Sequence, residues 1–97
     1  MKPLTPEHRA VLRKALDTYG KTSQITMAFE EMSELMKELS KNLRGRDNRS
    51  EIAEEIADVE IMLEQMKMLF DCEKSVYINR QAKIDRLEYI LGREVEE

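Results

Sequence analysis

The feature that most constrains this chain is the spacing of its apolar residues, which recur every three or four positions over most of its length. That spacing puts them on one face of an α-helix and does not match the alternation of a β-strand. The chain of 97 residues has only 3 glycines and 2 prolines, so little interrupts a helix. The sequence predicts a single all-α domain over residues 1–97, of the four-helix bundle type.

Local signals place the first two helices. Thr5 followed by Pro6 is typical of an N-cap and an N1 proline, so the first helix should run from Pro6 to Tyr19 and stop at Gly20. Thr22 or Ser23 can cap the second helix. The apolar face of the second helix is predicted to comprise Ile25, Ala28, Phe29, Met32, Leu35, Met36, Leu39 and Leu43.

Residues 44–50 contain a glycine and no apolar residue, which predicts a loop, with Asn48 or Ser50 available to cap the third helix. The fourth helix should begin near Ser75 and end at Gly92, a favourable C′ residue. The main apolar stripe of the third helix is Ile52, Ile56, Val59, Leu63, Met66 and Phe70, and the expected core face of the fourth is Val76, Ile84, Leu87 and Leu91.

The third helix carries a second apolar stripe at Ala57, Ile61 and Met68, on nearly the opposite side. A helix that is apolar on two sides is usually covered on two sides. One small bundle covers the first stripe, so we expect a second subunit to cover the other, in a homo-oligomer that is at least a dimer. The alternative is that the first helix folds over the second stripe and the chain stays monomeric.

Charge and composition exclude several classes of protein. A net charge of −4 argues against nucleic acid as the main partner, because duplex binding depends on cations that neutralise phosphates. No apolar run is long enough for a membrane helix, and the N-terminus lacks the apolar core of a signal peptide. The single cysteine, Cys72, suits a reducing compartment. We therefore expect a cytoplasmic protein.

Two pairs of acidic residues are the strongest candidates for chemistry. Glu31 and Glu34 on the second helix, and Glu55 and Asp58 on the third, are each three residues apart and share a helix side. Like charges at this spacing repel, and all four residues lie in or beside the apolar arcs of their helices. Because the two helices should pack antiparallel, the four carboxylates can converge.

Oxygen donors without histidine or cysteine are typical of Mg²⁺, with Mn²⁺ also possible, and not of zinc. The competing interpretation is a solvated acidic surface, since 20 of the 97 residues are acidic. On the fourth helix, Asn79, Lys83 and Arg86 share one face, and such cations beside a magnesium site could hold a polyphosphate. Taken alone, this trio also fits an ordinary solvated helix edge.

The motif Glu31-x-x-Glu34, followed about twenty residues later by Glu55-x-x-Asp58, resembles the all-α nucleoside triphosphate pyrophosphohydrolases of the MazG-like superfamily. Gln24 before the first motif, residues 61–65 after the second and Lys83-x-x-Arg86 near the end are similar to small bacterial and phage members. The resemblance covers roughly residues 18 to 91. It departs from some relatives in having no tryptophan to stack on a base.

The resemblance implies Mg²⁺-dependent cleavage of a nucleoside triphosphate between the α and β phosphates, giving a monophosphate and pyrophosphate. It implies that the four acids are metal ligands, that Lys83, Arg86 and less strongly Asn79 bind phosphate, and that Gln24 contacts the base or sugar. One of the metal-site carboxylates would accept a proton from water, and the sequence does not assign which one. It also implies a homodimer or a tetramer built from dimers.

Two alternatives remain open from the sequence. The first is hydrolysis of phosphoribosyl-ATP on the same scaffold. The second is a helical interaction or regulatory protein without enzymatic activity, in which the acids only solvate a surface.

Overall fold

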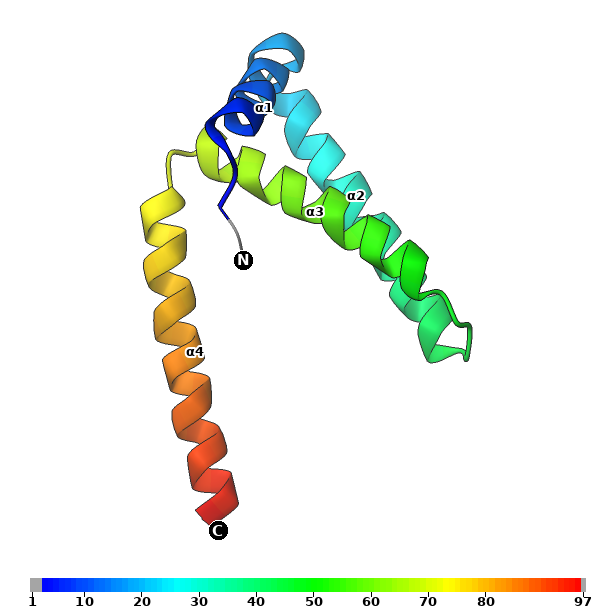
Figure 1. The fold of residues 1–97 in the computed structure, drawn as a ribbon, viewed down its shortest axis with the longest axis vertical. Helices are drawn as coiled ribbons and strands as arrows, with labels where there is room; N and C mark the ends of the chain where they lie inside the picture. Colours follow the sequence, from blue (N-terminus) through cyan, green and yellow to red (C-terminus); the bar gives the residue numbers. More distant parts are fainter. Residues whose placement is uncertain (1–2, 97) are drawn as a thin grey trace.

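The computed structural model describes residues 3–96, and it describes their side chains up to residue 93. Four helices make up this part of the chain: α1 (Pro6–Tyr19), α2 (Lys21–Leu43), α3 (Arg49–Leu69) and α4 (Glu73–Glu96) (Figure 1). None of residues 3–96 belongs to a strand, which confirms the all-α prediction. Among the described helices, none is both long and apolar enough to cross a membrane.

Gly20 controls the turn between α1 and α2. The predicted bounds of α1 are confirmed, and the Thr5 hydroxyl accepts the N–H of His8 at 3.1 Å. Gly20 adopts φ 88°, a conformation that favours glycine, and its N–H donates to the Leu16 carbonyl. The same residue precedes the first turn of α2, so the expected cap at Thr22 or Ser23 is wrong: α2 has already begun at Lys21.

An antiparallel hairpin of α2 and α3 forms the centre of the fold, and a buried asparagine closes it. Asn48, which is 2% exposed, donates from Nδ2 to the Glu38 carbonyl at 2.8 Å and to Glu38 Oε1 at 3.1 Å. Lys41 Nζ lies 2.8 Å from the same carboxylate. Asn48 stands at the N-cap position of α3, as expected, but its side chain ties the loop to α2 and makes no cap bond.

The core is small and lies where α1 crosses the end of this hairpin. Leu16 of α1, Ala28 of α2 and Met62 of α3 are its buried apolar residues among those described. The predicted core faces are wrong in part. Of the residues expected in the core of α2 and α3, eight are exposed: Phe29, Met32, Met36, Leu39, Leu43, Ile56, Leu63 and Phe70.

These residues are exposed because the seam, the line along which α2 and α3 pack, lies on a different side of each helix from the one expected. The seam residue Met62 lies between the two stripes expected on α3, so the hairpin buries Met62 and leaves the centre of the main stripe, at Ile56 and Leu63, turned to solvent. In the second stripe Ile61 also remains 44% exposed, so α1 does not bury it.

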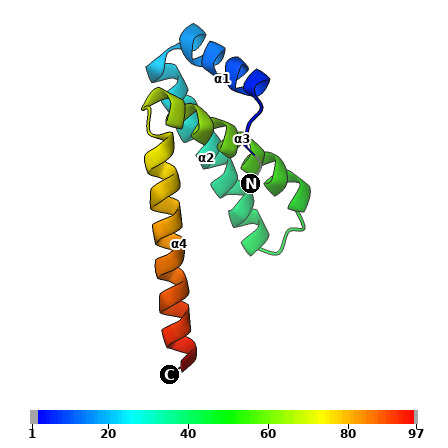
Figure 2. The ribbon, with the colours of Figure 1, turned by 60° about the vertical axis from the view of Figure 1, so that its left-hand side comes forward.

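The fourth helix leaves the other three at an elbow. Residues 70–72 end α3 in a Schellman motif, with Asp71 at φ 49° and the Cys72 N–H donating to the Lys67 carbonyl at 3.1 Å. From there α4 diverges from the hairpin, and α3 is the only one of the other described helices whose backbone lies close to it (Figures 1 and 2). The helix begins at Glu73, two residues before the expected Ser75, and continues through Gly92, so the predicted stop there is wrong.

The expected core face of α4 is therefore largely unpartnered in the single chain. Val76, nearest the elbow, is half-buried, whereas Ile84, Leu87 and Leu91 are exposed. The helix makes no turn back toward α2, and the molecule extends over 54 Å along its longest axis.

Replacing Asn48 by alanine should destabilise the hairpin. The substitution removes two bonds to Glu38 and the bond that Asn48 Oδ1 accepts from the Asn42 amide, a loss of about 1–3 kcal/mol. Urea unfolding at fixed protein concentration measures it. Asp47→Ala is the matched control, because Asp47 is exposed and should change stability by less than about 0.5 kcal/mol. Equal effects of the two substitutions would contradict the proposed role of Asn48.

Candidate metal centre on the α2–α3 hairpin

Three of the four predicted carboxylates meet across the seam between α2 and α3. Each of Glu31, Glu55 and Asp58 offers one oxygen, and these oxygens lie within 4.8 Å of one another. All three side chains are half-buried. The antiparallel register produces this meeting, because Glu31 comes from one helix and the i, i+3 pair of Glu55 and Asp58 comes from the other.

One oxygen of this cluster has no partner within the described chain. Glu55 Oε2 is shielded from solvent and accepts no hydrogen bond. A buried carboxylate oxygen without a donor or cation is unfavourable, so it marks a place where a ligand would be stabilised. Together with two further carboxylates, it forms an oxygen-only donor set of the kind that hard divalent cations prefer.

The electrostatics of the cluster show how closely the acids are held. Partial burial raises the pKa of Glu31, and the nearby carboxylates of Asp58 and Glu34 raise it further. Burial likewise raises the pKa of Glu55, with Asp58 and Glu31 as the next causes. Both pKa values are shifted in the direction expected for carboxylates that repel one another. A bound cation would favour the charged forms and so lower both pKa values.

The fourth predicted ligand stands slightly apart. Glu34 is exposed, and its carboxylate lies 3.8 Å from Lys37 on its own helix. It is nevertheless close enough to raise the pKa of both Glu31 and Glu55. The structure thus assembles three of the four acids and leaves Glu34 at the solvent side of the cluster.

Gln24 lies in the same seam as the acids, two helical turns before Glu31. Its side chain is only 5% exposed. By the register that pairs Glu31 with Asp58, Gln24 lies level with Gln65 of α3, which is 4% exposed and whose Oε1 has no hydrogen-bond partner. Sequence reasoning did not single out Gln65, because a glutamine among apolar helix residues gives no sign of burial until the seam is known.

The predicted phosphate-binding residues are not brought to the acids within one chain. Asn79, Lys83 and Arg86 are exposed on α4, which diverges from the hairpin (Figure 2). The Asn79 amide donates to the Ser75 carbonyl of its own helix at 2.7 Å. The cationic face and the acidic cluster therefore lie on separate parts of the chain.

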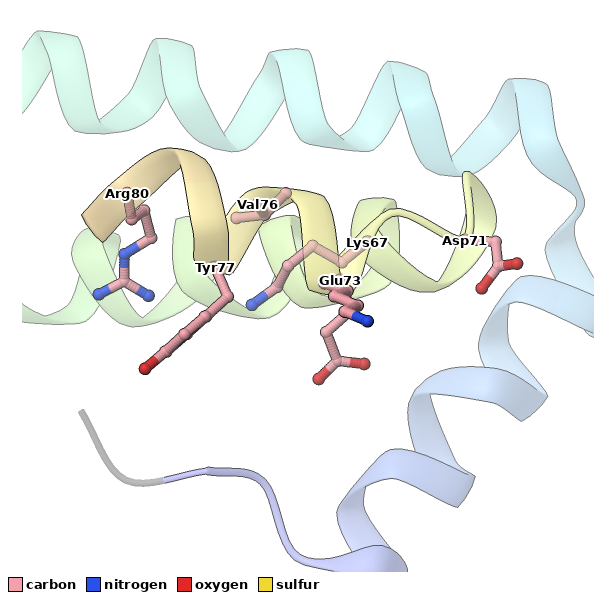
Figure 3. Close-up of a pocket in the computed structure, with 7 residues that line it drawn as sticks. Lys67, Asp71, Glu73, Val76, Tyr77 and Arg80 are labelled. Carbon is pink, nitrogen blue, oxygen red and sulfur yellow. The ribbon is translucent and has the colours of Figure 1, made fainter. Parts of the chain in front are cut away.

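Hollows of the described surface lie at the elbow, away from the acids. One of about 550 Å³ is lined by Lys67, Asp71, Glu73, Lys74, Val76, Tyr77 and Arg80 (Figure 3). Beside it, the Arg9 guanidinium bonds both carboxylate oxygens of Glu73, at 3.3 and 3.2 Å. The lining mixes charges of both signs without a convergent set of one kind, so the acid cluster remains the better candidate for chemistry.

Comparisons of the chain with protein-family models, with curated proteins and with solved structures find no match. The resemblance to the MazG-like superfamily stays a prediction from the motifs.

Without metal, the stability of the protein should depend on the pKa shifts of the cluster. The pKa values of Glu31 and Glu55 are higher in the folded state than in the unfolded state, so between the two values the folded state binds more protons. The contribution of these groups to the free energy of unfolding therefore rises as the pH falls through the raised pKa values toward the ordinary value of 4.5. The lowered pKa of Glu38 acts in the opposite sense, but only below its ordinary value.

Urea unfolding in the presence of a chelator tests this dependence. Glu55→Gln should flatten it, because one titrating group is gone and the repulsion on Glu31 is relieved. Glu60→Gln, an exposed acid of the same helix outside the cluster, should keep the wild-type slope. A wild-type slope in Glu55→Gln would show that the cluster is not formed in solution.

Proposed function

We propose that the chain is a Mg²⁺-dependent nucleoside triphosphate pyrophosphohydrolase that releases a nucleoside monophosphate and pyrophosphate. The observation that carries the proposal is the meeting of Glu31, Glu55 and Asp58 around an unpartnered, shielded carboxylate oxygen. These are three of the four acids in the MazG-like motifs, and they come from two different helices.

The donor set fits the proposed metal. Glu31, Glu55 and Asp58 would hold Mg²⁺, or Mn²⁺, through carboxylate oxygens, with Glu34 available at the solvent side. When bound there, the ion would neutralise phosphate charge and increase the acidity of a water molecule. Without a cation, repulsion among the carboxylates destabilises the fold, so packing does not account for their placement together.

The proposed reaction is attack of water on the α-phosphorus, with a carboxylate of the protein as the proton acceptor. A water oxygen forms a bond to the α-phosphorus, the bond from that phosphorus to the α–β bridging oxygen breaks, and pyrophosphate leaves. The water's proton passes to a carboxylate. We assign this acceptor to Glu34, because it adjoins the cluster and stays exposed while the other three acids converge.

Binding of the rest of the nucleotide is assigned to other residues. Lys83 and Arg86, with Asn79, would hold phosphate oxygens by charge-assisted hydrogen bonds. Gln24 would contact the base or sugar from the seam. We further propose that the protein is a cytoplasmic homo-oligomer, because its one cysteine suits a reducing compartment and its apolar helix faces lie exposed.

A second candidate function is a metal-responsive interaction protein without turnover. The observation that favours it is the exposed α4, whose apolar residues Ile84, Leu87 and Leu91 lack partners within the chain. Hydrolysis of phosphoribosyl-ATP is a variant of the first proposal and is separated from it by substrate alone.

Magnesium should stabilise the wild-type protein in a saturable manner. At a concentration one hundred times Kd, a cation that binds only the folded state adds about 2.7 kcal/mol to the free energy of unfolding. Glu55→Gln should abolish the response and leave the metal-free protein as stable as wild type or more so. Glu54→Gln removes the same charge from the exposed neighbouring position and should keep the response. If both variants responded alike, the cation would be sensing general acidity and not this site.

Turnover should appear in a panel of canonical and damaged nucleoside triphosphates together with phosphoribosyl-ATP, assayed for pyrophosphate with Mg²⁺. At least one substrate should release pyrophosphate and monophosphate, and Glu55→Gln should reduce the rate to background with its helical content unchanged. Release of orthophosphate alone would contradict cleavage between the α and β phosphates. Saturable magnesium binding with no turnover of any substrate would favour the interaction protein.

A further inference from the structure

We infer that the tip of the α2–α3 hairpin is a binding site for polyphosphate, separate from the metal centre. The site is a hollow of about 390 Å³ at the end of α2 and the start of the following loop, lined by Lys41, Arg44 and Arg46. It lies at the end of the hairpin remote from the elbow (Figure 1). The binding of an anion there rests on the geometry of the tip, whereas its use in holding a substrate rests on the proposed function.

The charge of this hollow has one sign, unlike that of the hollows at the elbow. All three side chains that line it are cationic, and Asp47, the acid of the loop, is not among them. Arg44 and Arg46 are exposed and form no ion pair with any described residue. A guanidinium group suits phosphate, because its planar N–H donors can bond two oxygens at once. The hollow therefore favours a compact anion with several charges, even in a chain whose net charge is −4.

One of the three cations is already paired within the hairpin. Lys41 donates to Glu38 at 2.8 Å, and the same carboxylate accepts a bond from the buried Asn48 at 3.1 Å. These two bonds lower the pKa of the Glu38 carboxyl, and the nearby charge of Arg46 lowers it further. Because the Glu38 side chain is only 13% exposed, it offsets Lys41 from inside the hairpin. Arg44 and Arg46 are left to meet an anion.

The loop that carries the two arginines is fixed by backbone hydrogen bonds. Gly45 adopts φ 98°, and its N–H donates to the Asn42 carbonyl at 2.9 Å. The Arg46 N–H donates to the Lys41 carbonyl at 3.2 Å, and the Arg46 carbonyl accepts a bond from the Asn42 amide at 3.3 Å. A loop that is already fixed loses less conformational entropy when a ligand binds, so the hollow is organised in advance.

A stripe of charged residues connects the hollow with the acid cluster. Glu34, Lys37, Lys41 and Arg44 follow one another at intervals of three, four and three residues, which places them on one face of α2. By the rise of an α-helix, Lys41 and Arg44 lie about 10 and 15 Å along the axis from Glu34. A nucleotide whose α-phosphate lies at the acids can therefore extend its terminal phosphates along this stripe toward the tip. Under the proposed function, the tip supplies cations from the same chain, which α4 holds away from the acids.

Titration with pyrophosphate in the presence of a chelator tests the anion site without reference to turnover. Calorimetry at fixed ionic strength should show saturable binding, and the Nε–H resonances of Arg44 and Arg46 should shift. Arg46→Gln should weaken binding by at least about tenfold, because charge-assisted bonds are lost, and Arg46→Lys should lose less because it keeps the charge. Arg49→Gln is the matched control. It removes the same charge from an exposed position nearby that does not line the hollow, and screening should limit its effect to less than about twofold.

Three results of this titration would overturn the inference. The first is the absence of saturable binding. The second is an equal loss of affinity in Arg46→Gln and Arg49→Gln, which would show that the anion senses general charge. The third is loss of binding in Lys83→Gln with full binding in Arg46→Gln, because the anion would then lie on α4.

A nucleotide that resists cleavage decides which polyphosphate the tip holds. An α,β-methylene nucleoside triphosphate should shift the same arginine resonances as pyrophosphate. Binding of pyrophosphate alone would assign the tip to the free anion and overturn its use in holding a nucleotide.

Turnover supplies the last comparison. The double variant Arg44→Gln, Arg46→Gln should raise KM by about tenfold or more and keep the stabilisation by Mg²⁺. An unchanged KM would leave the anion site in place and overturn its use for substrate. Absence of turnover in the wild type would count against the proposed function alone, because pyrophosphate binding still decides the anion site.

Discussion

The α2–α3 register is the constraint on which everything else in this protein depends. Asn48 sets it, by bonding to both the backbone and the side chain of Glu38 across the turn. With that end fixed, Glu31 falls opposite Asp58, and Gln24 falls level with Gln65 two turns further on. A slip of one residue would separate the acids and turn a different set of side chains into the seam, since each helical position faces its own direction.

Holding the acids together destabilises the free protein. The pKa values of Glu31 and Glu55 are raised by burial and by their neighbours, which means that their charged forms are disfavoured where they stand. A fold selected for stability alone would place apolar residues at these seam positions. Under the proposed function a bound cation would relieve this repulsion, and the shielded, unpartnered oxygen of Glu55 would be one of its ligands.

The same hairpin explains why so many apolar side chains of the described chain are exposed. The seam uses a narrow strip of α2 and α3, so the wider apolar faces of both helices remain in solvent, and α4 is directed away by the elbow. Small helical domains near 100 residues commonly gain the missing burial by association.

The sequence by itself determined the helices and the acids that form the cluster. Apolar spacing, Thr5-Pro6 and Gly20 predicted α1 correctly. The spacing of paired acids at i and i+3 singled out four acids, of which Glu31, Glu55 and Asp58 meet in the structure and Glu34 stays outside. Only the tertiary structure decided which side of each helix is buried. Periodicity identifies an apolar face but not which part of it a neighbour covers, so Met62 and Gln65 were missed, and Phe29 and Phe70 proved exposed. The direction of α4 could not be predicted from the sequence either. It depends on the backbone conformation at Asp71, which has φ 49°, and the local residue pattern does not specify that conformation.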